Sequence, residues 1–399
     1  MTALGLSVCI SMAAAVSLGM TRFAYALLLP PMRDDLLWSY TLAGAMNTFN
    51  AVGYLVGALL TPMALRRLGA VRVLIWGALF ATLFMALTGF LIDTSALLLQ
   101  RFLAGVASAA VFVSGGLLAA RLGAQTPSQS GLLLGIYYGG TGWGIVLSAL
   151  MVPAALSWAQ AQGVNHPWSW AWWTLAGLCL MLTILLIVIR LPLNRWAPDA
   201  PPSKMASTKS QPTGQALRQW FFALLGYGCF GVGYIGYMTF VVALLREQGA
   251  TPTDITLFYG LLGIAVVVSS RVWAGLLNRY RGGQALSILN GLLSVATVIP
   301  AMTSAWPLMM LSGLIFGVVF LSLVASTTAM VKHNLPPEQW ASGISAFTVI
   351  FALGQIVGPV VVGWIADGPG GLQRGLLFSA GALLLGAVLA WQQKPIQKN

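Results

Sequence analysis

Twelve long apolar stretches limit what this chain can fold into. Each is about as long as the roughly 20 residues that a helix needs to cross the hydrocarbon core of a bilayer. Because backbone groups in lipid must find partners within their own segment, we predict that all twelve are helices. They lie at 4–31, 39–64, 72–92, 97–120, 131–156, 169–190, 218–245, 255–278, 285–304, 307–331, 341–365 and 375–391.

Composition supports a membrane protein. The chain has 399 residues, of which 58% are hydrophobic and only 7% charged, whereas about a quarter of a soluble domain is charged. The net charge of +12 is compatible with nucleic-acid binding. However, the basic residues lie in short gaps between apolar stretches, as in membrane proteins, and not on one exposed face. We therefore expect membrane lipid as a partner, and no nucleic acid.

The distribution of Lys and Arg predicts the topology. With the N-terminus inside, the inner loops and the tail hold fourteen Lys and Arg residues and the outer loops three, which favours both termini in the cytoplasm of a bacterial inner membrane. No Lys or Arg precedes the first apolar stretch, so we expect a first transmembrane helix and no cleavable signal peptide. The polar stretch 190–218, rich in Pro, Ser and Lys, predicts a flexible linker. We expect bundles at 1–190 and 218–399, joined by a cytoplasmic linker at 191–217.

Motifs for catalysis and for metal binding are not found. Cys9, Cys179 and Cys229 lie in apolar stretches without metal-ligand spacing. The stretch GGTGWG (139–144) superficially resembles a dinucleotide loop. It lies within a predicted membrane helix, where glycines allow close helix contact, and no strand precedes it. We expect no enzyme activity, no cofactor and no metal.

The two halves of the sequence repeat each other. Gly19, Arg22 and Tyr25 align with Gly231, Tyr234 and Tyr237 at an offset of 212. The fifth stretch carries G-x3-G-G-x3-G from position 135, and the eleventh carries G-x3-G-P-x3-G from position 354. Matches in chain order at a nearly constant offset predict two pseudo-symmetric six-helix bundles.

These features resemble the major facilitator superfamily. The stretch RFLAGVASA (101–109) is similar to its fourth-helix motif, and GIYYGGTGWG (135–144) to its fifth-helix antiporter motif, with Gly140 where proline is usual. The loop motif is degraded in PMALRRLGAVR (62–72) and in RVWAGLLNRYRG (271–282). RFAYALLLP (22–30) together with NTFNAVGYLVGALL (47–60) resembles the YbfB-like branch. The resemblance implies a rocker-switch transporter, with its substrate between the halves.

The expected membrane interior is positively charged. All eight Asp and Glu residues fall in loops or at the ends of the apolar stretches, whereas Arg22, Arg101 and Arg271 fall within them. A buried Arg costs about 2.5 to 3.5 kcal/mol on insertion scales. We expect Arg101 to reach the outer end of its helix or to bind loop carbonyls. The resemblance places Arg22 on a cavity-lining helix, and Arg271 at a position that often serves the inner gate and is an Arg in some carboxylate transporters.

Polar residues at helical spacing accompany these arginines and predict a binding cavity. Since Arg matches the oxygens of a carboxylate, we predict a small organic anion, a carboxylate, as the substrate of a secondary transporter. A multidrug or neutral-compound exporter is the alternative, and a non-transporting receptor is a third class. The candidate substrate-binding residues are Arg22, Tyr25, Asn47, Asn50, Tyr54, Tyr234, Tyr237, Arg271 and Gln355.

Coupling and gating remain as hypotheses. No acid or histidine lies within an apolar stretch, so a coupled proton would need Asp34, Asp35 or the substrate itself as its carrier. Exchange for a counter-substrate and uniport are both open. Arg66 and Arg67 are expected near Glu338, where they would form an inner latch when the inner mouth is closed. We expect a monomer.

Overall fold

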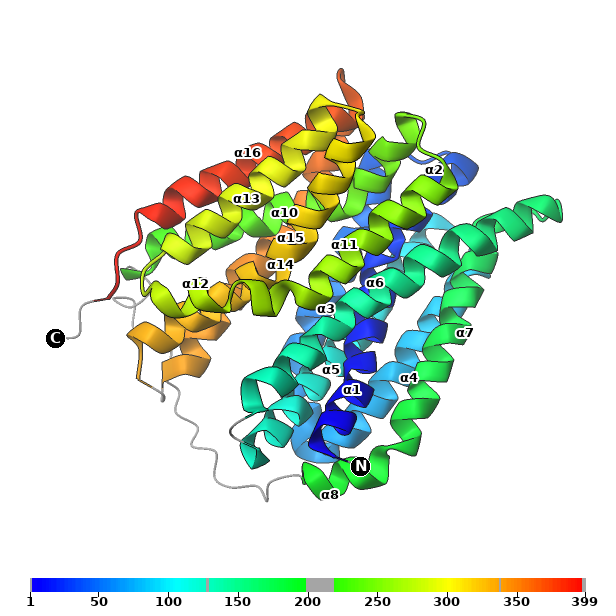
Figure 1. The fold of residues 1–399 in the computed structure, drawn as a ribbon. Coiled ribbons are helices and arrows are strands. Elements are labelled where there is room, and N and C mark those ends of the chain that lie inside the picture. The colour runs from blue at the N-terminus through cyan, green and yellow to red at the C-terminus, as the bar shows by residue number, and fades with distance from the viewer. Residues whose placement is uncertain (1, 127–128, 199–218, 337–338, 397–399) are drawn as a thin grey trace.

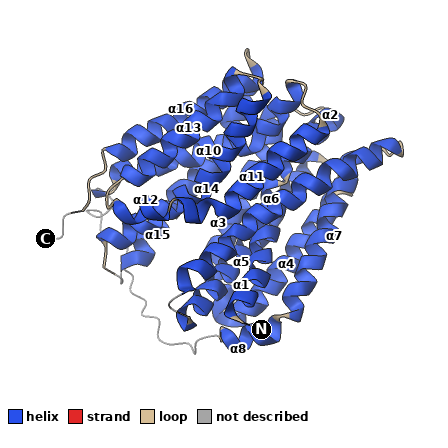
Figure 2. Ribbon diagram, in the orientation of Figure 1, coloured by secondary structure: helices blue, strands red, loops and turns tan. Residues whose placement is uncertain are grey.

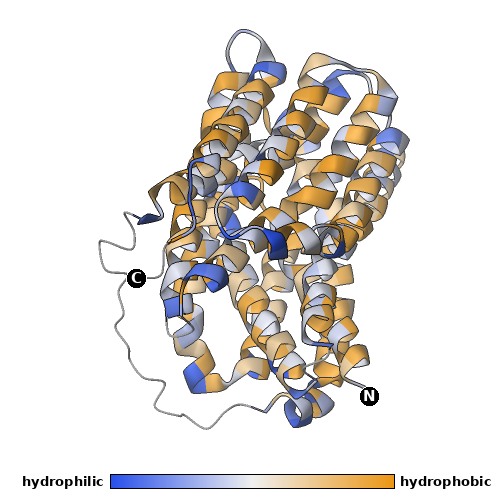
Figure 3. Cartoon of the chain, turned by 60° about the vertical axis from the view of Figure 1, so that its left-hand side comes forward, coloured by the Kyte–Doolittle hydropathy of each residue, from blue (hydrophilic) through white to orange (hydrophobic). Residues whose placement is uncertain are grey.

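The computed structural model describes residues 2–126, 129–198, 219–336 and 339–396. Within these ranges the chain forms helices and no strand (Figure 2). Twelve of the helices are long and apolar enough to cross a membrane, which confirms the predicted number of spans. Most residues along these helices are hydrophobic, and many of the hydrophilic ones lie near helix ends and in loops (Figure 3).

The first six spans pack against one another. The first span consists of three consecutive segments, and a short helix follows the sixth. The elements are α1 (Ala3–Ala14), η1 (Ala15–Phe23), α2 (Tyr25–Leu36), α3 (Tyr40–Leu68), α4 (Ala70–Thr88), α5 (Thr94–Gln125), α6 (Ser130–Ala161), α7 (Pro167–Val188) and α8 (Arg190–Trp196).

The last six spans form the second bundle. Its elements are α10 (Phe221–Glu247), α11 (Pro252–Val272), α12 (Ala274–Arg279), α13 (Gln284–Met302), α14 (Trp306–Asn334), α15 (Trp340–Ala366) and α16 (Gly371–Trp391). The helix over the predicted eighth span breaks at Trp273, between α11 and α12. The predicted linker begins with α8, and residues 199–218 lie outside the described part of the chain.

Helix ends follow local capping rules. The Ser39 side chain accepts from the Leu42 N–H at the start of α3, and Asp93 accepts from the Ala96 N–H at the start of α5. Thr251 and Asp254 form a capping box at the start of α11. Such caps satisfy N–H groups that have no partner within the helix.

The glycines of the fifth and eleventh spans let helices approach closely, as the sequence predicts. A Cβ at Gly140 would lie 1.9 Å from the Ser11 carbonyl oxygen, and one at Gly144 2.5 Å from that of Ala15. In the second bundle, a Cβ at Gly354 would lie 2.5 Å from the Gly228 carbonyl oxygen. The first helix of each bundle therefore packs backbone to backbone on the fifth.

The two bundles converge at the end opposite the termini and diverge toward the end that carries them (Figure 1). Two glycine-rich crossings join them. A Cβ at Gly44 on α3 would lie 2.2 Å from the Pro359 carbonyl oxygen on α15, and one at Gly142 on α6 would lie 2.4 Å from that of Gly263 on α11. The candidate site lies between these crossings.

Candidate functional site

Arg22 lies in a π-helical segment, η1, inside the first span. The Ala24 N–H donates to the Gly19 carbonyl five residues earlier (3.0 Å), and the Thr21 hydroxyl donates to the Val16 carbonyl (2.7 Å). A π-helical segment adds a residue to the turn and is frequent at functional sites. Gly19 also packs on Gly144, since a Cβ there would lie 2.5 Å from the Gly144 Cα.

The Arg22 side chain connects the two bundles. Arg22 is 3% exposed, and its Nη2 donates to Gln355 Oε1 on α15 (2.7 Å). Gln355 Nε2 donates in turn to the Tyr234 hydroxyl on α10 (2.6 Å). The Tyr54 ring on α3 lies 5.7 Å from the guanidinium carbon. Four predicted site residues thus meet, and the repeat-related pair Arg22 and Tyr234 is bridged by Gln355.

A second arginine, Arg101 on α5, makes a parallel connection. It is 1% exposed. Its Nη1 donates to the Thr21 carbonyl (2.9 Å) and its Nη2 to Asn47 Oδ1 (3.3 Å). Asn47 Nδ2 donates to the Thr239 hydroxyl on α10 (2.8 Å), and Asn50 Nδ2 to the Arg101 carbonyl (3.1 Å). The expectation that Arg101 reaches the helix end is wrong, because acceptors on η1 and α3 hold it inside the bundle.

The polar cluster carries positive charge without a carboxylate. Six Asp and Glu side chains lie in the described part of the chain, and none of them is buried. Arg22 Nε, Arg101 Nε and Asn50 Oδ1 are buried without a hydrogen-bond partner. The ring centroids of Tyr25 and Trp172 lie 5.1 and 5.7 Å from the Arg101 guanidinium carbon, which offsets part of the desolvation cost. Two buried cations with free donor capacity favour an anionic ligand.

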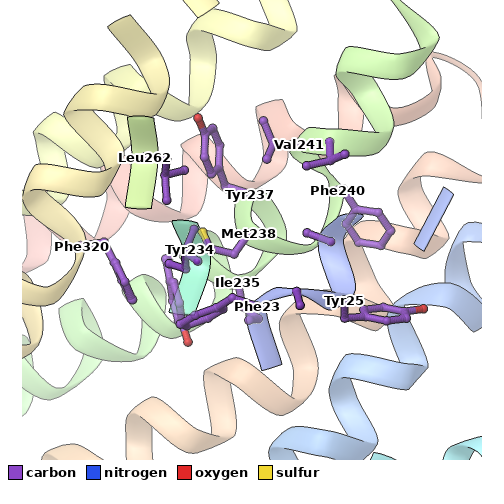
Figure 4. Packing of buried hydrophobic residues seen from close by; sticks show 14 of the residues in the cluster. Phe23, Tyr25, Tyr234, Ile235, Tyr237, Met238, Phe240, Val241, Leu262 and Phe320 are labelled. Atoms are coloured by element: carbon purple, nitrogen blue, oxygen red, sulfur yellow. The ribbon is translucent and has the colours of Figure 1, made fainter. Parts of the chain in front are cut away.

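Two predicted site tyrosines have hydroxyl groups that bind protein partners. The Tyr25 hydroxyl donates to the Ala43 carbonyl (2.8 Å). The Tyr237 hydroxyl lies 2.7 Å from Ser312 Oγ, and its ring stacks on Phe316 with centroids 4.0 Å apart. Both tyrosines lie in the aromatic core around η1 and α10 (Figure 4). They contribute packing to the walls of the site.

The remaining predicted residues lie elsewhere. Arg271 is exposed and borders a groove formed by α1, α6 and α11, so the structure does not bring it together with Arg22. Arg66 and Arg67 are exposed in the last turn of α3. Glu338, their proposed latch partner, lies outside the described residues.

A contact at the end opposite the termini was not predicted. Asp367, which caps the end of α15, accepts from the Tyr40 and Thr41 N–H groups at the start of α3 (2.6 and 2.9 Å) and from the Thr41 hydroxyl (2.6 Å). The Tyr40 hydroxyl donates to Glu247. Burial raises the pKa of Asp367, but these hydrogen bonds outweigh it and hold the pKa below its ordinary range. Asp367 therefore binds the helix N-terminus as an anion.

The sequence predicts Asn47 and Asn50 as site residues, and it also carries a signal that could have placed Arg101 with them. Arg101 belongs to the recognised fourth-helix motif, and Asn47 and Asn50 lie on one face of a neighbouring span. Thr239 and Asp367 had no such signal, because neither stands in a motif.

Comparisons with known proteins agree with this architecture. Residues 14–391 match the family described as uncharacterised MFS-type transporter YbfB. A curated protein of Agrobacterium vitis named "Putative tartrate transporter" is 23% identical over 393 residues, which cover 90% of this chain and 83% of that protein.

Two solved transporters have the same fold. The nucleoside transporter NupG is 14% identical, with a TM-score of 0.73 over 98% of this chain and 100% of that one. A bacterial homologue of the human lysosomal transporter Spinster, solved inward-facing and unoccupied, is 13% identical, with a TM-score of 0.72 over 98% of this chain and 96% of that one. The chain is thus a multi-pass membrane transporter of the major facilitator superfamily that acts on a small molecule, and it belongs to the YbfB family of that superfamily.

Proposed function

We propose that this transporter moves a small organic anion, a carboxylate, across the bacterial inner membrane by alternating access. The observation that carries the proposal is the pair of buried arginines, Arg22 and Arg101, with no buried acid in the described part of the chain. The name of the Agrobacterium vitis relative supports a carboxylate. We infer no catalytic activity for this site.

The carboxylate would complete the electrostatics of the site. Each guanidinium has an Nε donor without a partner, and a carboxylate accepts two parallel N–H bonds from an Arg. Hydrogen bonds to charged groups contribute about 1.5 to 3 kcal/mol each. A substrate carboxylate would compete with the Gln355 oxygen for Arg22, since Gln355 Oε1 accepts from Nη2. Substrate binding would therefore loosen one link between the bundles.

The contacts between the two bundles support a specific geometry for the conformational change. We propose that the bundles at 1–190 and 218–399 rock about the crossings at Gly44 and Gly142, with both termini in the cytoplasm. The end held together by Asp367 would then face outward. Proton coupling through a buried protein carboxylate is not part of the proposal, since the described acids lie at helix ends and loops. A carboxylic-acid substrate can bring its own proton.

Uptake into proteoliposomes tests this proposal. Purified protein would be assayed with labelled mono- and dicarboxylates, tartrate included, and with neutral and cationic drugs. We expect carboxylate uptake that falls by at least about tenfold in Arg22→Ala, because each charged hydrogen bond corresponds to that factor or more. Arg195→Ala, which removes an exposed arginine of α8, serves as the matched control and should transport normally.

Two outcomes would contradict the proposal. Carboxylate uptake that is unchanged in Arg22→Ala would remove the role of the buried cation. Transport of the drugs without transport of any carboxylate would favour the multidrug exporter.

A further inference from the structure

Arg271 is an exposed arginine in the last turn of α11 that the central site does not use. This helix begins at Pro252 and ends at Val272. Nineteen residues separate Pro252 from Arg271, which at 1.5 Å per residue is about 28 Å. Since the hydrocarbon core is about 30 Å thick, Arg271 is positioned at the headgroup level of the leaflet that contains the termini.

Arg271 shares one face of α11 with exposed apolar side chains. Leu257, Ile264, Val268 and Arg271 follow one another at intervals of seven, four and three residues and therefore share one face of α11. The three apolar members are 53%, 52% and 42% exposed, and Arg271 is exposed as well. Arg271 therefore lies on an exposed, largely apolar face of α11.

A groove runs beside this arginine. Its volume is ≈ 640 Å³. Val8 from α1, Leu132 and Trp143 from α6 and Val268 from α11 line it. All four are exposed. The groove is thus mostly apolar, and Arg271 is the one charged residue among those that line it.

Glycines of α6 keep the groove open. Gly131, Gly135 and Gly139 are among the lining residues. Nothing lies within 4 Å of a Cβ built at Gly131, and the nearest atom to one at Gly139 is 3.5 Å away. A side chain at Gly131 would therefore project into free space, whereas a Cβ at Gly135 would lie 3.3 Å from Ser270 Oγ on α11.

We propose that this groove binds an anionic phospholipid, with the phosphate on Arg271 and an acyl chain along α6. An Arg guanidinium matches two phosphate oxygens, and basic pockets between transmembrane helices bind anionic headgroups. Within the described part of the chain, Arg271 has no hydrogen-bond or ion-pair partner, so its donors are available. The acyl chain contacts Val8, Leu132 and Trp143, and the glycines provide the space for it.

Native mass spectrometry of the delipidated protein in detergent tests this proposal. The protein would be offered phosphatidylglycerol and phosphatidylcholine with identical acyl chains. We expect a roughly fivefold preference for phosphatidylglycerol, the factor that one basic residue at the membrane surface supplies. Arg271→Gln should abolish the preference, while Arg374→Gln, the same change at an exposed position in the first turn of α16, should keep it.

A second pair of variants tests the contribution of the groove to lipid binding separately from the charge of Arg271. Gly131→Leu fills the groove and leaves Arg271 intact, so bound phosphatidylglycerol should fall by a similar factor. Gly177→Leu on α7 is the matched control, because nothing lies within 4 Å of a Cβ there either. It should bind lipid as the unmodified protein does.

Three results would overturn the lipid site. The first is an undiminished preference for phosphatidylglycerol in Arg271→Gln. The second is unchanged lipid binding in Gly131→Leu, and the third is displacement of the lipid by soluble glycerol 3-phosphate at equal concentration. The readout is lipid binding in the absence of transport, so a failure of the carboxylate proposal leaves this test unaffected.

Discussion

At the scale of single residues, the central feature is the chain of hydrogen bonds from Arg22 through Gln355 to Tyr234. The amide of Gln355 has one acceptor and it is directed at the guanidinium. This arrangement links a cation of one bundle to a tyrosine of the other. Gln355 is neutral, so Arg22 keeps its positive charge for a ligand.

Gln355→Glu tests whether that charge must stay available. The new carboxylate would pair with Arg22 at the 2.7 Å position of the present amide oxygen, and the ion pair would compete with an anionic substrate. We expect the KM for a carboxylate to rise by at least about tenfold, since a hydrogen bond to a charged group contributes about 1.5 to 3 kcal/mol. The KM is obtained from uptake measured at varied substrate concentration.

The control for that change is Gln339→Glu, which introduces the same charge at the start of α15. It should leave the KM unaltered. A KM that is equal in Gln355→Glu and in the unmodified protein would show that Gln355 does not face the substrate.

At the scale of elements, much of the fold follows from the sequence and the orientation of the helices does not. Span number and glycine packing depend on local apolar length and on small residues, and both could be predicted. Arg101 and Arg271 lie in similar apolar stretches of the sequence, yet Arg101 is buried and Arg271 is exposed. In a membrane helix both faces are apolar, so the sequence pattern does not show which face points inward. The residues around Arg22 likewise carry no sequence pattern that predicts a π-helical turn.

The crossing of α6 and α11 gives a prediction about glycines. A Cβ at Gly142 would lie 2.4 Å from the Gly263 carbonyl oxygen, whereas nothing lies within 4 Å of one at Gly260. Gly260→Ala should stabilise the protein by about 0.5 to 1 kcal/mol, the usual gain from replacing a helical Gly. Gly142→Ala should destabilise it by about 1 to 3 kcal/mol through overpacking.

Thermal unfolding in detergent measures both variants. The prediction is a higher midpoint for Gly260→Ala and a lower one for Gly142→Ala than for the unmodified protein. Equal midpoints for the two variants would mean that α6 and α11 do not approach as closely as the structure places them.

At the scale of the whole molecule, the contact between Asp367 and the start of α3 holds one end of the two bundles together. The hydrogen bonds hold the pKa of Asp367 below its ordinary value, which is about 3.9. A depressed pKa means that the contact is fully present above that value and is lost only as the pH falls through the folded pKa. We therefore expect no opening of this end between about pH 5 and 8.

Asp367→Asn should open this end, because the amide removes the negative charge at the helix N-terminus. Distances between spin labels at Ile92 and Ser304, one in each bundle, would report it in a protein without its three native cysteines. We expect longer distances in the variant at neutral pH. Identical distance distributions, or opening of the unmodified protein on mild acidification, would refute this role of Asp367.

The proposed transport of a carboxylate depends on recognition of its negative charge by the buried arginines. Equilibrium binding measures this recognition most directly. Purified protein and Arg22→Gln would be titrated with a panel of mono- and dicarboxylates and with the uncharged amide of each. The account predicts that at least one carboxylate binds the unmodified protein at least about tenfold more tightly than its amide, and that Arg22→Gln loses this difference. Equal binding of acids and amides, or a difference that survives in Arg22→Gln, would contradict it.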